Sequence, residues 1–177
     1  MMNIFYSDEI ATGKTFSLAM DESVHCTQVL RKKTGDIILL TNGKGGFFEG
    51  EIISDKTKNC IIKVIKELAD PLKSSYRLTL AIAPTKSNDR FEWFLEKATE
   101  IGCHEIIPLH CKHAERTVIK TDRLNKVLIS AMKQCLKSEL PKLHELHSFD
   151  AFLESSAHFK GQKFIGHIPE LSNSEFP

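Results

Sequence analysis

The spacing of hydrophobic residues differs between the first part of the chain and the rest. Up to about residue 68, apolar residues form short runs separated by turn-forming glycine, asparagine and lysine. Short runs of β-branched and aromatic residues between tight turns predict strands. The predicted strands are Asn3–Tyr6, Thr15–Leu18, Ile37–Thr41, Phe47–Ser54 and Cys60–Leu68, with a short helix at Asp21–Leu30. Several short strands joined by tight turns favour a small β-barrel.

The glycine-rich segment Asn42–Gly46 has two interpretations. Its three glycines and one lysine resemble a loop that cradles phosphate groups. Such a loop opens a helix, however, whereas this segment joins two predicted strands, so a hairpin turn is favoured.

A strand, a helix and a second strand are predicted after a linker at Ala69–Ser75, which places the domain boundary between residues 70 and 71. Arg77–Ala83, the first strand, alternates and then runs apolar until Pro84, and Cys103–Leu109 is the second strand. Between them, apolar residues recur at helical spacing: Phe91, Phe94, Leu95, Ala98 and Ile101. Asp89 and Glu92 fit a capping box, and Gly102 fits a left-handed helix end. A helix between two strands implies a parallel pair and therefore an α/β domain.

The last part of the chain predicts two more helices and a third strand. The first helix starts at Asp122, which we expect to cap it, and runs to about Ser138 before Pro141 ends it. Phe149–Phe159 is the second helix, and Lys163–His167 is expected to be the third parallel strand. A sheet that stopped there would keep an unpaired edge, which further chain or a partner subunit would cover.

Basic residues collect where ligands bind in open parallel sheets, beyond the carboxyl ends of the strands. The loop after the first strand offers Lys86 and the adjoining Arg90, and the loop after the second offers Lys112 and Arg116. The overall charge is balanced, with 24 basic and 23 acidic residues, but His110–Lys142 holds eight Lys or Arg against three acids. A phosphate-bearing partner and an ordinary solvated loop both fit this pattern.

Three acids on the central helix, Glu92, Glu96 and Glu100, are spaced to form one row. Such a row is explained either by exposure to water or by pairing with basic residues, for which Arg90, Lys97 and the region from Lys112 to Lys126 are available.

The composition argues against several classes of site and location. Five cysteines without a CxxC pair argue against a disulfide framework and favour a reducing compartment. No secretory signal is present, and no apolar run approaches the ~20 residues that span a bilayer, so we expect a cytoplasmic protein without membrane contact. The histidines and cysteines between His104 and His113 lack the spacing of a metal site, and no thiol lies in an activating motif.

Several motifs together resemble one family. Lys86, Arg90, Glu92, Trp93, Lys97–Gly102 and Ile107–Pro108 resemble the K…R.EW…KATE(L/I)G…I.P signature of the small-subunit ribosomal RNA methyltransferase E family. His25, Val29–Arg31, Gly35–Asp36 and Asn42–Gly43 resemble its H…VLR…GD…(D/N)G pattern, and Ala131–Pro141 resembles its A.EQ…P segment.

The resemblance implies an N-terminal PUA-like barrel and a SPOUT-class parallel α/β domain that uses S-adenosylmethionine to methylate N3 of a uridine in 16S ribosomal RNA. It implies 16S ribosomal RNA or the small ribosomal subunit as partner, and a homodimer. On this basis Lys86, Arg90 and Arg116 are the expected RNA-binding residues, joined by Lys112, while Glu100 and Gln134 are expected to orient neighbours. Arg31 lies in a basic triplet that fits an RNA phosphate contact or a solvated corner equally well.

One departure from the family pattern limits these expectations. The family's GPEGGF-type loop and LR.ETA segment, which form the knot and most of the cofactor pocket, are absent from this sequence. We therefore expect a fragment or a shortened relative that is inactive alone. His167, at the expected end of the third strand, is the candidate cofactor residue, although a histidine stacked at a strand end fits as well. The residue that removes the N3 proton is not identified. The alternative function is a noncatalytic RNA-binding protein.

Overall fold

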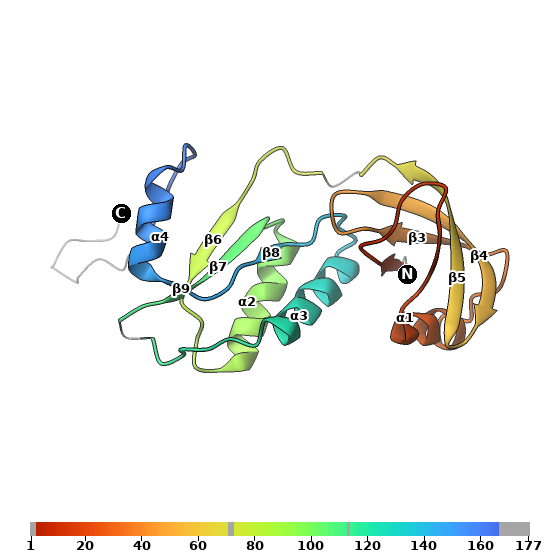
Figure 1. The fold of residues 1–177 in the computed structure, drawn as a ribbon, viewed down its shortest axis with the longest axis horizontal. Helices are drawn as coiled ribbons and strands as arrows, with labels where there is room; N and C mark the ends of the chain where they lie inside the picture. Colours follow the sequence, from red (N-terminus) through yellow and green to blue (C-terminus); the bar gives the residue numbers. More distant parts are fainter. Residues whose placement is uncertain (1–2, 71–72, 113, 167–177) are drawn as a thin grey trace, which may run out of the picture.

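The computed structural model of the protein describes residues 3–70, 73–112 and 114–166. Two sheets lie side by side along the long axis of the molecule, and the second sheet carries helices α2 and α3 on one face (Figure 1). The chain passes once from the first sheet to the second, between β5 and β6.

The first sheet is built from the five strands that the hydrophobic pattern predicts. They are β1 (Ile4–Tyr6), β2 (Thr15–Ser17), β3 (Ile37–Thr41), β4 (Phe47–Lys56) and β5 (Asn59–Leu68). Their order is β1-β3-β4-β5-β2, with β1 parallel to β3 and the other pairs antiparallel. The sheet curls into a half-barrel around a core that includes Phe5, Leu40, Ile52 and Ile62 (Figure 1).

A glycine at the inside of the curl allows the two long strands to bend. The register of β4 against β5 shifts between Glu49 and Gly50. A Cβ atom added at Gly50 would lie 2.6 Å from both Ile62 Cγ2 and Leu40 Cδ1. The bulge increases the local twist, and only a residue without a side chain fits at this close approach.

The helix predicted at Asp21–Leu30 is present but changes type. An α-helical turn, α1 (Met20–Val24), continues as a π-helical turn, η1 (His25–Val29). The buried Ser23 hydroxyl donates to the Leu18 carbonyl at 3.1 Å and accepts from the Cys60 N–H at 3.1 Å. These bonds fix the helix against β5.

The second sheet contains the predicted parallel pair. β6 (Thr79–Ile82) and β7 (Glu105–His110) are parallel and are joined by α2 (Asn88–Glu100), after which Gly102 has φ +87°. α3 (Thr121–Gln134) packs beside α2 (Figure 1). Together they bury a core that includes Phe91, Leu95, Ile106 and Leu128.

The third parallel strand lies earlier in the chain than predicted. β8 (Lys142–Leu143) and β9 (His147–Ser148) both pair parallel with β7, and α4 (Phe149–Ala157) follows them. The prediction of a strand at Lys163–His167 is wrong for residues 163–166, which have no regular structure. Phe164 and Ile165 are 90% and 86% exposed, so no burial stabilises a strand there. His167 lies outside the described residues.

Both predicted helix caps are wrong. Ser87 is the N-cap residue of α2 and Lys120 that of α3, and neither helix has a side-chain cap bond. Asp89 and Asp122 instead lie in the first turns of these helices, where their charges still suit the helix dipole.

α3 also ends before the predicted stop at Pro141. Its last residue is Gln134, because Leu136 adopts a left-handed backbone with φ 55°. The Lys137 N–H donates to the Met132 carbonyl at 3.1 Å, and the Leu136 N–H donates to the Lys133 carbonyl at 3.4 Å. This is the Schellman arrangement with leucine in the position usually held by glycine.

The first residue of β7 links three elements of the second sheet. Glu105 Oε2 lies 2.9 Å from His144 Nε2, and Glu105 Oε1 lies 3.4 Å from Arg77 Nη2. The hydrogen bond from His144 lowers the pKa of Glu105 below its ordinary value of 4.5, with a smaller contribution from Arg77, while burial acts in the opposite direction. The ionised carboxylate therefore favours the folded state.

Acid should weaken the fold through this carboxylate. A pKa that is lower in the folded state gives stability above the unfolded value, and this stability is lost as pH falls through the folded pKa. We expect Glu105→Gln to reduce the fall in melting temperature below pH 4.5, measured by circular dichroism across acidic pH. Glu145→Gln, at an exposed position, is the matched control. Equal acid dependence in wild type and Glu105→Gln would contradict this role.

Candidate nucleic-acid interface

The loops after β6 and β7 are tied together by one arginine. Arg116 Nη1 donates to the Asn88 side-chain oxygen at 2.5 Å, and Arg116 Nη2 donates to the Lys86 carbonyl at 2.6 Å. Lys86 Nζ in turn lies 3.0 Å from Glu115 Oε2. The loops of two neighbouring parallel strands therefore form one surface at the carboxyl edge of the sheet.

Four of the five predicted RNA-binding residues lie on this surface, which we call the loop surface: Lys86, Arg90, Lys112 and Arg116. The Lys86 side chain is 82% exposed, Arg90 and Lys112 are exposed, and Arg116 is half-buried. The backbone amide groups in the first turn of α2 also point toward this edge. The N-cap residue makes no side-chain bond to them. Positive side chains and free amides are suited to phosphate groups.

Arg31, the fifth predicted residue, is not part of the loop surface. It follows η1 in the half-barrel, is exposed, and has φ 55°. The α1–η1 segment lies toward the opposite end of the long axis from the loops after β6 and β7 (Figure 1). A polynucleotide that met both places would have to run along the molecule.

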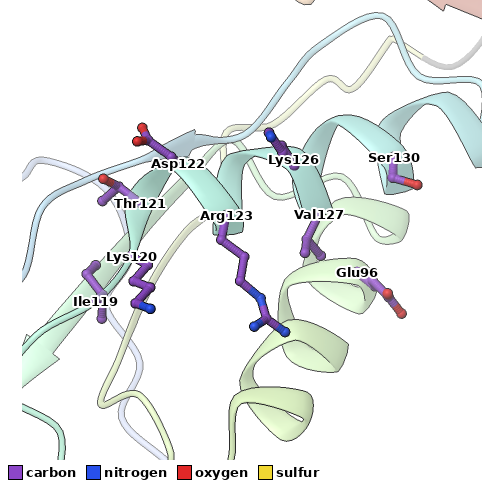
Figure 2. Close-up of a pocket in the computed structure, with 9 residues that line it drawn as sticks. All are labelled: Glu96, Ile119, Lys120, Thr121, Asp122, Arg123, Lys126, Val127 and Ser130. Carbon is purple, nitrogen blue, oxygen red and sulfur yellow. The ribbon is translucent and has the colours of Figure 1, made fainter. Parts of the chain in front are cut away.

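An open hollow lies along the first half of α3. It is an open groove of about 740 Å³, lined mainly by α3 and the residues just before it, with Glu96 contributed by α2 (Figure 2). The lining includes three basic residues, Lys120, Arg123 and Lys126, and two acids, Glu96 and Asp122. The lining of the groove therefore carries one more basic than acidic residue.

Two of the three acids in the row on α2 pair with basic residues, as one of the two interpretations predicted. Arg123 Nε lies 2.7 Å from Glu92 Oε1, and the Glu92 side chain is only 19% exposed. In Figure 2 the Arg123 side chain extends from α3 toward α2. Glu100 pairs with Lys97 at 2.8 Å, whereas Glu96 is exposed. The pairing of Glu92 joins the two helices that support the loops.

Arg116 is the feature that sequence reasoning underestimated. It was expected to contact RNA, but two of its nitrogen atoms already hold the loops together. A guanidinium has five N–H donors, so others remain for a ligand. A polar pair of Asn and Arg on facing loops is the only sequence signal for this bond.

The thiols and histidines have structural surroundings. Burial raises the pKa of Cys103, and it raises the pKa of Cys26 to about 12, so both favour the unreactive thiol form. His104 Nδ1 accepts from the Leu78 N–H at 3.1 Å, while its Nε2 lies 3.1 Å from Glu139 Oε2. Within the described residues, His, Cys, Asp and Glu side chains form no group of three that could hold a metal ion. No helix in the described ranges is both long and apolar enough to cross a membrane.

Comparison with known proteins finds relatives over nearly the whole chain. The Bacillus subtilis ribosomal RNA small subunit methyltransferase E is 28% identical over 160 residues, which are 85% of this chain and 61% of the relative. The Rickettsia conorii protein of the same name is 29% identical over 182 residues, covering 97% of this chain and 74% of the relative.

Solved structures with the same fold are also found. A probable rRNA-methyltransferase from Porphyromonas gingivalis has a TM-score of 0.79 and 37% identity, covering 86% of this chain and 63% of that one. The Neisseria gonorrhoeae ribosomal RNA small subunit methyltransferase E, crystallised with S-adenosyl methionine, has a TM-score of 0.78 at 24% identity, covering 86% and 65%. This chain thus spans less than two thirds of the Bacillus relative and of both solved structures.

The two sheets correspond to two known domain families. Residues 19–65 match the RNA methyltransferase PUA domain, in the half-barrel. Residues 72–174 match the RNA methyltransferase domain, which contains the parallel sheet. The second match covers more than half of the 177 residues, and the chain therefore belongs to the RNA methyltransferase family.

Proposed function

We propose that this protein is an S-adenosylmethionine-dependent methyltransferase that acts on N3 of a uridine in 16S ribosomal RNA. The supporting observation is the loop surface, where four cationic residues lie at the carboxyl edge of a parallel sheet in a chain of the RNA methyltransferase family. Its relatives from Bacillus and Rickettsia carry the name of a small-subunit ribosomal RNA methyltransferase.

In this proposal the described residues bind and position RNA. Lys86, Arg90 and Lys112 would contact phosphates, while Arg116 would order the two loops and use its remaining donors on the same backbone. The PUA domain would hold a second stretch of RNA, with Arg31 as a phosphate contact. Holding the target uridine in a fixed position is the contribution that these residues make to the reaction.

The cofactor supplies the electrophilic methyl group, but neither of two hollows among the described residues fits it. The groove beside α3 is open and lined mostly by charged or hydroxyl side chains, and the hollow between the domains holds only about 30 Å³. The groove is too open, and the second hollow too small, to be the enclosed cleft that a nucleoside cofactor requires. We therefore assign no reaction step to residues of this chain through the cofactor.

This mismatch gives a direct prediction for the 177-residue chain. We expect isothermal titration calorimetry to detect weak binding of S-adenosylmethionine or none, because neither of these two hollows encloses a ligand of its size. The Neisseria enzyme, whose crystal structure contains the cofactor, is the positive control. Micromolar binding by the 177-residue chain would show that the cofactor site has been misplaced.

A noncatalytic RNA-binding protein is the second candidate, and the same lack of an enclosed cleft favours it. Reading the gene beyond codon 177 separates the two functions. A glycine-rich loop followed by an LR.ETA-like segment would support the enzyme. A stop codon, together with retained RNA binding, would support the binding protein.

We also propose a homodimer in the cytoplasm, where the ribosomal substrate is found. α4 buries none of its residues, and Phe149 and Leu153 on this helix are 41% and 48% exposed, which is consistent with cover by another surface. Sedimentation equilibrium would test this, since a monomer at micromolar concentration would exclude the dimer for this chain.

A further inference from the structure

The turn between β3 and β4 is bonded directly to the methyltransferase domain. The Gly45 N–H donates to the Ser138 carbonyl at 3.0 Å, and the Leu140 N–H donates to the Gly43 carbonyl at 2.9 Å. Between these bonds, Lys44 and Glu139 form an isolated antiparallel bridge. The hairpin of one domain and the segment after α3 in the other therefore share a short ladder. We call this contact, formed by residues 42–46 and 138–140, the interdomain ladder.

Two buried hydroxyl groups complete the ladder. Thr41 and Ser138 are 0% and 1% exposed. Thr41 Oγ1 accepts from the Gly43 N–H at 3.1 Å and lies 3.0 Å from both the Ser138 and the Gly46 carbonyl oxygens, so its single proton can serve either. The Ser138 hydroxyl donates to the Asp70 carboxylate. Buried polar groups satisfied across a contact specify one docked geometry, because any other geometry would leave them unpaired.

The shape of the turn requires glycine at the contact. Gly43 has φ +69°, and a Cβ atom there would lie 2.8 Å from Tyr6 Cε2 and 3.2 Å from Leu140 Cβ. The Asn42 side-chain oxygen accepts from the Lys44 and Gly46 N–H groups at 2.9 and 3.0 Å, which holds the turn in shape. A side chain at position 43 would therefore push against the partner domain as well as strain the backbone.

One ion pair extends the contact between the domains beyond the ladder. Lys133 of α3 pairs with Glu22 of α1, and their side chains are only 23% and 16% exposed. Within the methyltransferase domain, Glu139 Oε2 lies 3.1 Å from Nε2 of His104, just before β7, which holds the ladder segment against the sheet. The left-handed Leu136 turns the chain out of α3 toward the ladder, so a strained residue precedes the docking segment.

From these contacts we infer that the interdomain ladder holds the PUA domain and the methyltransferase domain as one rigid body, with Thr41, Gly43 and Ser138 as positioning residues for RNA. The consequence for RNA rests on the proposed function, whereas the rigidity does not. Rigid docking fixes the separation between Arg31 and the loop surface. Binding of a polynucleotide to both places therefore includes no entropic cost for ordering the domains.

Residual dipolar couplings of the backbone amides test the rigidity. In the wild-type chain, both domains are expected to fit one alignment tensor. Gly43→Val should require two tensors, because its side chain meets Leu140 of the methyltransferase domain. Gly13→Val is the matched control, since Gly13 has φ +78° with nothing within 4 Å of an added Cβ atom. A wild-type chain that needs two tensors overturns the inference even if Gly43→Val fails to fold.

Fluorescence anisotropy with a labelled uridine-rich single-stranded RNA tests the positioning role. Gly43→Val is expected to bind about tenfold more weakly than Gly13→Val, because the two contact regions no longer act at a fixed separation. Equal affinity of these variants, with the domains shown to be uncoupled, would overturn the positioning role. A wild-type chain that binds no RNA would refute the proposed function and the positioning role together, while the couplings still decide on rigidity.

Discussion

Replacing both Arg90 and Arg116 by alanine is expected to lower RNA affinity about tenfold and to flatten its dependence on salt. Even about 0.7 kcal/mol for each lost contact sums to 1.4 kcal/mol, which is a factor of ten. Each phosphate contact to a single strand contributes about 0.7 to the slope of log affinity against log salt, so two lost contacts should reduce it by about 1.4. Anisotropy titrations across a range of salt concentrations measure both quantities.

Two further variants separate the charge of Arg116 from its structural role. Asn88→Ala removes one partner of Arg116 without changing the charge of the loop surface, so it tests loop order alone. Arg116→Lys keeps the charge but cannot make both loop bonds at once. If phosphate binding dominates, both variants keep the salt slope of the wild type. If Asn88→Ala loses as much RNA affinity as the double variant, Arg116 acts by ordering the loops. If the double variant keeps the salt slope of the wild type, neither arginine is part of the interface.

The parallel pair could be predicted because burial on one side of a helix leaves a regular pattern. Phe91, Leu95 and Ala98 recur at helical spacing and are 1%, 0% and 2% exposed. The same pattern also included Ile101, which lies just after α2 and is 58% exposed, so not every residue of the pattern is buried. The sequence therefore identified the helix and its inner face, but not the point at which the buried stripe ends.

The third strand could not be predicted because its pieces are too short to carry a pattern. β8 and β9 contain two residues each and gain their hydrogen bonds from β7, which was already in place. Residues 163–166 had the composition of a strand but no neighbour to pair with in the described structure. Tertiary context outweighed local preference at both places.

The candidate site shows the same division between local and distant information. Basic residues after predicted strands could be located from the sequence, because parallel topology places such loops at one edge. The bond from Arg116 to Asn88 spans 28 positions, and the interdomain ladder consists largely of backbone groups. Contacts of this kind leave no hydrophobic pattern, so only the folded structure shows that Asn42–Gly46, predicted as a hairpin turn, also docks on another domain.

Truncating the centre of the second core, by Phe91→Ala, is expected to cost about 3–5 kcal/mol of folding free energy. Phe91 is 1% exposed and stacks on Phe94, with ring centroids 5.9 Å apart. The loss should be a large fraction of the stability of a small domain, which is typically about 5–15 kcal/mol. Since α2 supports Arg90 and the loop after β6, RNA binding should fall with it. Urea denaturation followed by circular dichroism measures the free energy.

Phe94→Ala is the matched control, because Phe94 shares the stacking contact but is only partly buried. Its loss should be clearly smaller, since less apolar surface leaves water when the ring folds against Phe91. If the interdomain ladder makes the two domains one cooperative unit, Phe91→Ala should shift a single transition that includes the half-barrel. If the half-barrel keeps its own unfolding midpoint in this variant, the ladder is weaker than the cores that it joins. Equal losses of folding free energy in Phe91→Ala and Phe94→Ala would contradict the central place of Phe91 in the core.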